Sequence, residues 1–264
     1  MPTIPHVFEG LEPHTTSFYL DAVAALTDAK VPFLFGGAYA LAYYTKIARH
    51  TKDLDLFVKP ADAPRALETL KKAGYRTEMT FPHWLGKAFC GDDFIDVIFS
   101  SGNGLCPVDD DWFTYSVRLE PIGALLCPAE ELIWQKAYIM ERERFDGADI
   151  IHLLRARGPV LDWEHLLRRF GPHWHLLLAH LILFRFVYPA ERDRVPAHIV
   201  ESLLERWRND MADGTSKERI CQGTLLSRTQ YLNDTEHWGY EDARMSPRGP
   251  MTVEQITHWT AASK

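Results

Sequence analysis

The sequence predicts an α+β domain followed by an all-helical domain, and two observations carry this prediction. In the first half, short apolar or alternating runs typical of strands are mixed with helical patterns, whereas after Pro128 the patterns are helical only. Strands mixed with helices and then helices alone indicate two separately packed domains. We expect a mixed domain over residues 1–127, a helical domain over 128–213 and a C-terminal arm over 214–264. The arm either packs back on the body or is partly disordered.

The elements of the first half follow from local patterns. Phe18, Ala22 and Leu26 share one face of 16–30 at helical spacing. An amphipathic helix over 61–73 ends at Gly74, a residue typical of helix C-termini. The other predicted elements are strands at 31–35, 53–58, 75–80, 85–90 and 93–99, a helix at 38–45, a loop at 100–111 and a weakly strand-like stretch at 117–126.

The second half contains helical patterns as far as Met211 and turn-rich sequence beyond it. Gly, Pro, Asn and polar residues dominate from Gly214 onward, which is why that part is expected to be an arm. The predicted helices are at 129–144, 147–156, 163–170, 174–188 and 198–211.

Composition excludes several classes of protein. The formal net charge is -7, so a basic nucleic-acid footprint is absent on average, although a local basic patch remains open. The N-terminus has no positive start and no apolar signal run, and the longest apolar stretch, 176–187, contains His180 and Arg185. The four cysteines show no CxxC spacing. We therefore expect a cytoplasmic protein with reduced thiols and no membrane partner.

The segment 49–58 carries the strongest chemical signal. Successive side chains of a strand point to opposite faces, so Asp53 and Asp55 share one face and Leu54 and Leu56 take the other. Two carboxylates roughly 7 Å apart repel each other and contribute nothing to a core. A divalent cation such as Mg²⁺ or Mn²⁺ would remove that repulsion and use both groups as ligands.

Two further features complete a candidate site. Asp96 lies on the 93–99 strand with apolar neighbours on its own face, which is costly for a carboxylate unless it is paired or bound to metal. If that strand lies beside 53–58, the three carboxylates converge. Gly36 and Gly37 stand between a buried strand and a helix, where glycine lets the backbone approach phosphates and the helix N-terminus favours an anion.

This ordered set of residues resembles the core of the nucleotidyltransferase superfamily that includes DNA polymerase beta. The pattern is most similar to the bacterial minimal nucleotidyltransferases, including abortive-infection toxin and lincosamide nucleotidyltransferases, and the likeness covers about 33–154. It implies a mixed sheet with flanking helices. It also implies that Asp53 and Asp55 bind the nucleotide-associated and catalytic metals, while Asp96 completes the catalytic metal site and acts as, or positions, the base. Gly36 and Gly37 would hold the phosphates.

The resemblance extends to three further residues with open alternatives. Lys136 would reach the phosphates from the helical domain, unless it belongs to a solvated helix face. Arg49 and Thr51 flank the metal strand; Arg49 contacts a phosphate or forms a structural ion pair within the motif. Many catalytic members have Gly-Ser where this chain has Gly36 and Gly37, so one hydroxyl contact to phosphate is missing.

The expected activity is Mg²⁺- or Mn²⁺-dependent transfer of a nucleoside monophosphate from an NTP to an acceptor hydroxyl, with release of pyrophosphate. The acceptor is a small molecule, a tRNA 3′ end or a protein side chain. The alternative is a non-catalytic nucleotide-binding protein or one half of a toxin–antitoxin pair. A metal-dependent phosphohydrolase is disfavoured because no His ligands stand in register with the Asp residues.

Overall fold

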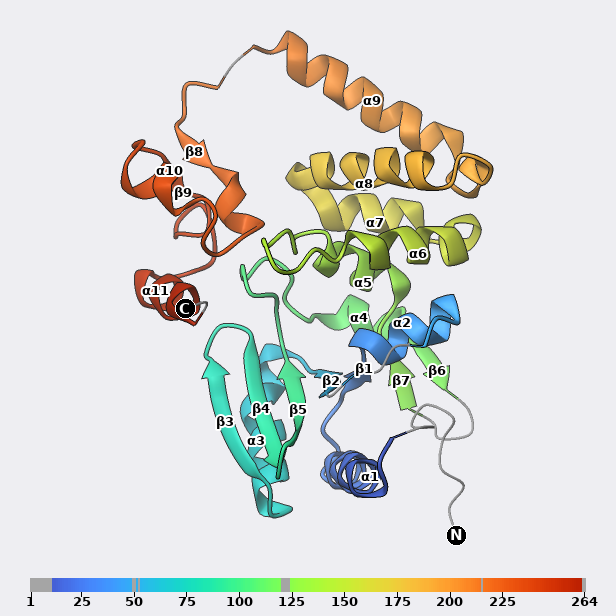
Figure 1. Cartoon of the computed structure of the whole chain (residues 1–264), viewed down its shortest axis with the longest axis vertical. Coiled ribbons are helices and arrows are strands. Elements are labelled where there is room, and N and C mark those ends of the chain that lie inside the picture. Colours follow the sequence, from blue (N-terminus) through green and yellow to red (C-terminus); the bar gives the residue numbers. More distant parts are fainter. Residues whose placement is uncertain (1–10, 49–50, 52, 120–123, 215, 263–264) are drawn as a thin grey trace. The chain divides into compact units, whose positions relative to one another are not determined.

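The computed structural model of the chain describes residues 11–48, 51, 53–119, 124–214 and 216–262. The chain divides into two compact units, Met1–Pro128 and Ala129–Lys264. In Figure 1 the first unit is coloured from blue to green and the second from yellow-green to red.

A mixed sheet forms the centre of the first unit. The strands described there are β1 (Leu34–Phe35), β2 (Asp53–Phe57), β3 (Arg76–Phe81), β4 (Leu85–Cys90), β5 (Asp93–Ile98), β6 (Val117–Leu119) and β7 (Ala124–Leu126). Their order across the sheet is β3-β4-β5-β2-β1-β7-β6. β2 is parallel to β5 and β1 is parallel to β7, whereas the other neighbouring strands are antiparallel. This mixed sheet, with a helical region after it, confirms the α+β fold class predicted from the sequence.

Helices pack on this sheet through their apolar stripes. The helices described in the first unit are α1 (Pro13–Asp28), α2 (Gly37–Thr45), the 3-10 turn η2 (Pro60–Asp62), α3 (Ala63–Lys72) and α4 (Asp110–Thr114). α3 buries Ala66, Leu67 and Leu70, and it packs on β3, β4 and β5 as well as on α1 (Figure 1). α2 packs on β2, which brings its N-terminus to the strand that carries the paired carboxylates.

Alternation along β2 separates the core from the candidate site. Leu54 and Leu56 are fully buried, whereas Asp53 and Asp55 on the other face are half-buried. Burying a leucine side chain stabilises a fold by about 1.5–3 kcal/mol, so the leucines fix which face of the strand points inward. The carboxylates take the opposite face as a consequence.

Two stretches of the first unit differ from their sequence-based interpretation. The predicted loop at 100–111 ends in the short helix α4, because the Asp109 side chain accepts a hydrogen bond from the backbone N–H of Asp111 at 3.1 Å and caps the helix. The strand-like stretch at 117–126 contains two strands, β6 and β7, which pair antiparallel; residues 120–123 between them lie outside the described residues.

The second unit is helical over most of its length. Its elements up to residue 212 are α5 (Ala129–Lys136), α6 (Gly147–Arg157), η3 (Gly158–Val160), α7 (Trp163–Phe170), η4 (Gly171–His173), α8 (Trp174–Val187), η5 (Arg192–Arg194) and α9 (Ala197–Ala212). α5 packs on α6 and α7, and α8 packs on α6, α7 and α9. The helices predicted after residue 146 agree with these to within a few residues at each end.

The predicted helix over 129–144 is wrong beyond Lys136. There the chain turns: the N–H of Ile139 bonds to the carbonyl of Lys136 at 3.0 Å, and the N–H of Asp146 bonds back to the carbonyl of Ile139 at 3.2 Å. The turn returns Asp146 to Lys136, whose ammonium lies 2.5 Å from its carboxylate. The buried ion pair between Lys136 and Asp146 requires this turn, so the helix does not continue beyond Lys136.

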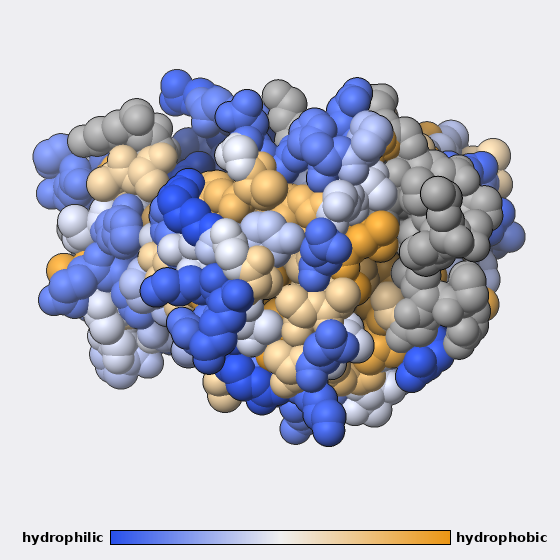
Figure 2. Space-filling view, turned by 90° about the horizontal axis from the view of Figure 1, so that it is seen from below, coloured by the Kyte–Doolittle hydropathy of each residue, from blue (hydrophilic) through white to orange (hydrophobic). Residues whose placement is uncertain are grey.

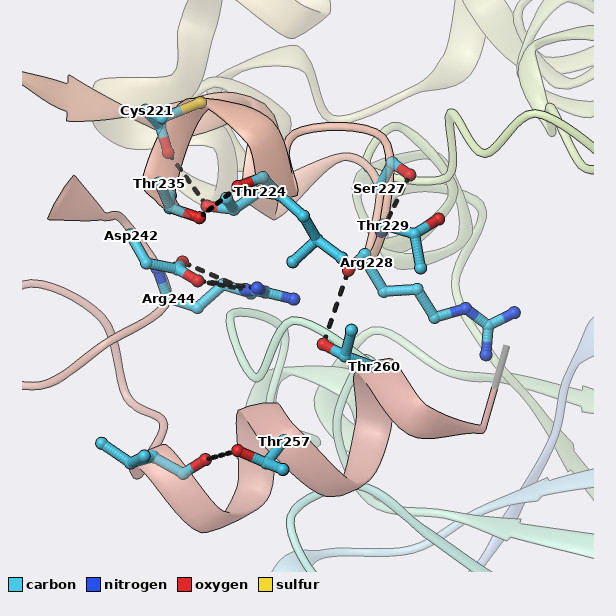
Figure 3. Close-up of polar contacts among 12 residues, drawn as sticks. Cys221, Thr224, Ser227, Arg228, Thr229, Thr235, Asp242, Arg244, Thr257 and Thr260 are labelled. Carbon is cyan, nitrogen blue, oxygen red and sulfur yellow. Dashed lines mark hydrogen bonds and ion pairs between the residues drawn. The ribbon is translucent and has the colours of Figure 1, made fainter. Parts of the chain in front are cut away.

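The C-terminal part consists of short elements joined by polar contacts. They are β8 (Ile220–Cys221), η6 (Gln222–Leu225), α10 (Leu232–Glu236), β9 (Glu241–Asp242) and α11 (Val253–Ala261). Arg244, fully buried, donates from Nε and Nη2 to the Asp242 carboxylate at 3.0 and 2.6 Å, and the Thr260 hydroxyl donates to the carbonyl of Arg228 at 3.5 Å (Figure 3). The Thr260 bond ties α11 to the stretch that contains Arg228, and the Arg244 pair holds the Asp242 side chain of β9 in place.

The same segment bonds to the turn after α5. The Ser227 hydroxyl donates to the Glu141 carboxylate at 2.5 Å, and the backbone N–H of Arg228 donates to it at 3.1 Å. The N–H of Met140 donates to the carbonyl of Leu226 at 3.1 Å. The described part of the arm therefore packs within the second unit. The division of this unit into a helical domain over 128–213 and an arm over 214–264 stays a prediction.

The described residues include no helix that is both long enough and apolar enough to cross a membrane. On the face drawn in Figure 2, hydrophilic residues surround a central area where hydrophobic residues reach the surface. A mixture of this kind is ordinary on folded proteins and identifies no particular surface as a binding site.

Candidate metal centre

One row of residues crosses four neighbouring strands of the sheet. Lys87 on β4 pairs with Asp96 on β5, and Asp96 pairs with Asp55 on β2. The backbone N–H of Gly36, directly after β1, donates to the carbonyl of Asp55 at 3.0 Å and extends the row. Residues paired on neighbouring strands direct their side chains to the same face. The row therefore brings together the ammonium of Lys87, the carboxylates of Asp96 and Asp55, and the glycine turn.

Asp53 completes a cluster of three carboxylates on this face. One carboxylate oxygen each from Asp53, Asp55 and Asp96 lies within 4.8 Å of the other two, and all three residues are half-buried. The pairing of β2 with β5 confirms the expectation that the two strands lie side by side. Two negative charges about 5 Å apart repel by about 3 kcal/mol at an effective dielectric constant of about 20, so the cluster favours a bound cation.

Thr51 orients one of these carboxylates. Its hydroxyl donates to the Asp53 carboxylate and also lies 3.2 Å from the Asp53 carbonyl. Thr51 thus holds one carboxylate of the cluster directly, a contact that the sequence did not predict. Arg49, the other residue predicted to flank the metal strand, lies outside the described residues.

Gly36 and Gly37 pack directly against the acidic strand. A Cβ atom on Gly36 would lie 2.1 Å from the ring of Phe57, and one on Gly37 would lie 1.5 Å from Oδ2 of Asp55. Gly37 also has a φ of +50°, a conformation that residues with side chains rarely adopt. Gly37 takes the place of the serine in the Gly-Ser pattern. With Asp55 where it is, this position has no room for a serine side chain.

Lys87 is the charged residue of this site that the sequence interpretation missed. Its ammonium lies 2.6 Å from Oδ1 of Asp96 and 4.0 Å from the centre of the Phe94 ring. A signal for it was present, since Gly91 and Asp92 form the two-residue turn of the β4–β5 hairpin, in which Cys90 pairs with Asp93. Counting back from that turn places Lys87 opposite Asp96.

Two phenols also lie within the electrostatic reach of the cluster. Burial raises the pKa of Tyr39 on α2, and the negative charges of Asp53 and Asp55 raise it further. Burial likewise raises the pKa of Tyr19 on α1, with smaller contributions from Tyr39 and from acidic residues that include Asp53 and Asp55. Both hydroxyls thus stay protonated at neutral pH. Tyrosines carry no motif at these positions, so sequence reasoning gave no reason to select them.

Lys136 lies in the second unit, in a buried charge network. Its ammonium contacts Asp146 at 2.5 Å and Asp149 at 2.8 Å, and Arg144 also bonds to Asp146 at 2.9 Å. Burial alone would raise the pKa of Asp146, but the hydrogen bonds and charges of Arg144 and Lys136 outweigh burial and lower it. The solvated-face alternative for Lys136 does not describe this buried side chain, and its predicted contact with phosphates stays a prediction.

The donor set fits a divalent metal ion. Three carboxylates that converge within 4.8 Å supply the hard oxygen ligands that Mg²⁺ and Mn²⁺ prefer. Supporting contacts to ligands, such as that of Thr51 with Asp53, are typical of metal sites.

A family model described as "uncharacterised nucleotidyltransferase" matches residues 21–186, more than half of the chain. The chain belongs to this family. The match includes the acidic cluster, the glycine turn and Lys136, and it confirms the resemblance to nucleotidyltransferases. No curated protein matches the chain.

Solved structures with loosely similar folds include other nucleotidyltransferases. The solution structure of the antibiotic-resistance factor ANT(2'')-Ia is 16% identical, with a TM-score of 0.39 over 77% of this chain and 96% of its own. A crystal structure of ANT(2'')-Ia with adenylyl-2''-tobramycin is 14% identical, with a TM-score of 0.41 over 67% and 99%. JHP933 from Helicobacter pylori is 14% identical, with a TM-score of 0.40 over 77% and 99%.

Proposed function

We propose that this protein transfers a nucleoside monophosphate from an NTP to an acceptor hydroxyl in a reaction that depends on Mg²⁺ or Mn²⁺. The observation that carries the proposal is the convergence of Asp53, Asp55 and Asp96 beside the Gly36 and Gly37 turn. In the reaction, the acceptor oxygen bonds to the α-phosphorus and the bond from that phosphorus to the pyrophosphate oxygen breaks. The hydroxyl proton passes to a carboxylate oxygen, and pyrophosphate leaves.

The three carboxylates share two tasks in this proposal. Asp53 and Asp55 hold the metal, and Asp96 completes the catalytic position and accepts, or positions the acceptor of, the hydroxyl proton. When bound, the metal lowers the pKa of the attacking hydroxyl and neutralises charge on the phosphate and pyrophosphate oxygens. Thr51 keeps the Asp53 carboxylate in place through its hydrogen bond.

The glycine turn supplies the phosphate contact. An α-helix leaves the N–H groups of its first turn without acceptors inside the helix, and its N-terminus carries partial positive charge. α2 begins at Gly37, which lies against Asp55, so the first turn of the helix is adjacent to the proposed metal ligands. The absence of a Cβ at Gly36 and Gly37 lets this turn pack directly on Phe57 and Asp55, which brings the first turn of α2 next to the acidic cluster. Arg49 and Lys136 remain proposed additional contacts to phosphate.

Nucleotidyl transfer can be tested by label incorporation. The purified chain is incubated with each α-labelled NTP and Mg²⁺ together with pools of cellular RNA, cellular protein and small molecules. We expect label in one pool, with transfer lost in Asp55→Asn and retained in Asp110→Asn, which alters an exposed carboxylate (85% side-chain exposure) paired with Lys59 in the same unit. Transfer that survives in Asp55→Asn would refute the proposed use of the acidic cluster.

The same experiment separates catalysis from binding alone. Metal-dependent binding of an NTP with no label in any pool would support the non-catalytic or toxin–antitoxin alternative. Binding is followed by thermal unfolding, because a ligand at about 100 times its dissociation constant stabilises the folded state by about 2.7 kcal/mol. The pool that takes up the label identifies the acceptor class as small molecule, tRNA or protein hydroxyl.

A further inference from the structure

We propose that Lys87 is a built-in counter-ion of Asp96, so that the acidic cluster binds one divalent cation tightly and a second one only weakly. The inference rests on the proposed function, since it concerns the metal occupancy of that site. Lys87 is a positioning residue in this account: it acts on Asp96 and on the charge of the site, not on the reacting atoms.

The contact between Lys87 and Asp96 is fixed by backbone pairing. Both residues lie at one register position of the β4–β5 hairpin, and the ammonium is 2.6 Å from Oδ1 of Asp96. The side chains are only 21% and 14% exposed, so water screens this pair less than it screens a surface pair. The ammonium also lies over the Phe94 ring, 4.0 Å from its centre, which holds the lysine on this face of the sheet.

Charge balance then limits the number of cations. Three ionised carboxylates and one ammonium have a summed charge of minus two, which a single divalent ion neutralises. Asp53 and Asp55 share one face of β2 and lie one strand further from Lys87 than Asp96 does. We therefore expect the first ion to bind between these two carboxylates. A second ion near Asp96 would meet the positive charge of Lys87 at close range. Bound NTP, which adds negative charge, is what would favour that second ion.

Metal stoichiometry tests the inference without any turnover. The full-length chain is titrated with Mn²⁺, and the signal of the free ion is followed by electron paramagnetic resonance. We expect the wild type to bind its first ion at least about tenfold more tightly than a second one, and Lys87→Met to raise the affinity for the second ion by about tenfold or more. Lys87→Arg keeps the charge and should retain the wild-type pattern.

A matched control removes the same charge elsewhere. Lys59 forms an ion pair with Asp110 in the first unit, outside the acidic cluster, so Lys59→Met should bind Mn²⁺ like the wild type. If Lys87→Met does not fold, as judged by its circular dichroism, Lys87→Gln takes its place, and the wild-type stoichiometry itself remains a test.

Two results would overturn the inference. One is a wild type that binds two Mn²⁺ ions with equal affinity, or none. The other is a lysine variant whose second-ion affinity stays within about twofold of the wild type. Failure of nucleotidyl transfer with one tight Mn²⁺ ion counts against the proposed function alone. Transfer by a protein with two equal Mn²⁺ sites counts against the role of Lys87 alone.

Discussion

Replacing Gly37 by alanine tests how the glycine turn holds the acidic strand. The added Cβ would lie 1.5 Å from Oδ2 of Asp55, whereas ordinary contacts begin at 3.4 Å. The carboxylate oxygen must therefore move by about 1.9 Å. Metal–ligand distances tolerate only about 0.2 Å, so a shift of this size removes Asp55 from any ion that it shares with Asp53 and Asp96.

The effect on stability is smaller than the effect on binding. A residue with a side chain at a φ of +50° costs about 1–2 kcal/mol, and crowding in a packed site costs about 1–3 kcal/mol more. A loss of about 2–5 kcal/mol leaves most domains folded, because domains are stable by about 5–15 kcal/mol. We therefore expect Gly37→Ala to remain folded and to bind Mn²⁺ at least about tenfold more weakly.

The assay combines denaturant unfolding with Mn²⁺ titration, and Gly91→Ala is its control. Gly91 has a φ of +61°, and apart from its chain neighbours no atom of the described residues lies within 4 Å of the place that a Cβ would take, so this variant carries the backbone cost without the collision. The control should lose stability by about 1–2 kcal/mol and bind Mn²⁺ normally. If Gly37→Ala binds Mn²⁺ as the wild type does, the close packing of Gly37 on Asp55 has no part in the site.

Three further predictions concern the supporting contacts. Thr51→Val removes the hydroxyl that bonds to Asp53 and should weaken Mn²⁺ binding by about tenfold in the same titration, with unchanged binding counting against its role. Lys136→Met leaves the buried carboxylates of Asp146 and Asp149 without the ammonium that they share. The free energy of unfolding, measured with denaturant, should fall by about 3–5 kcal/mol. A loss below about 1 kcal/mol would mean that the network is not stabilising. The pKa of Asp146 is lowered in the folded state below its ordinary 3.8, so its ionised form contributes stability that is present above that value and is lost as the pH falls through the lower, folded pKa. Asp146→Asn should accordingly show a weaker fall in stability below about pH 4 than the wild type does, as followed by thermal unfolding over a pH series.

The sequence was informative where a repeating pattern met a strong physical constraint. Alternation along β2 allows one assignment of faces, since Leu54 and Leu56 must be buried, and it predicts the shared face of Asp53 and Asp55 directly. The apolar neighbours of Asp96 likewise pointed to a carboxylate that needs a partner. The partner present in the structure, Lys87, depends on the pairing of another strand, which a search for motifs within single segments does not consider.

The sequence was misleading where tertiary contacts decide the backbone. Ala137 and Tyr138 are buried and continue the apolar pattern of α5, so local reasoning extends the helix. The helix ends at Lys136 nonetheless, because the turn that follows returns Asp146 to the lysine ammonium. Local propensity carries only tenths of a kcal/mol per residue, and leaving such charges unpaired in a buried place costs several kcal/mol.

The parallel pairing of β2 with β5 has a consequence for how the site comes into being. The chain between Asp55 and Asp96 contains α3, β3 and β4, so no short fragment of the chain contains all three carboxylates. The proposed affinity for an ion is thus a property of the assembled sheet, and such binding would be thermodynamically linked to the folding of the first unit. An ion that binds both Asp55 and Asp96 would close a loop of about forty residues and would reversibly link the two central strands.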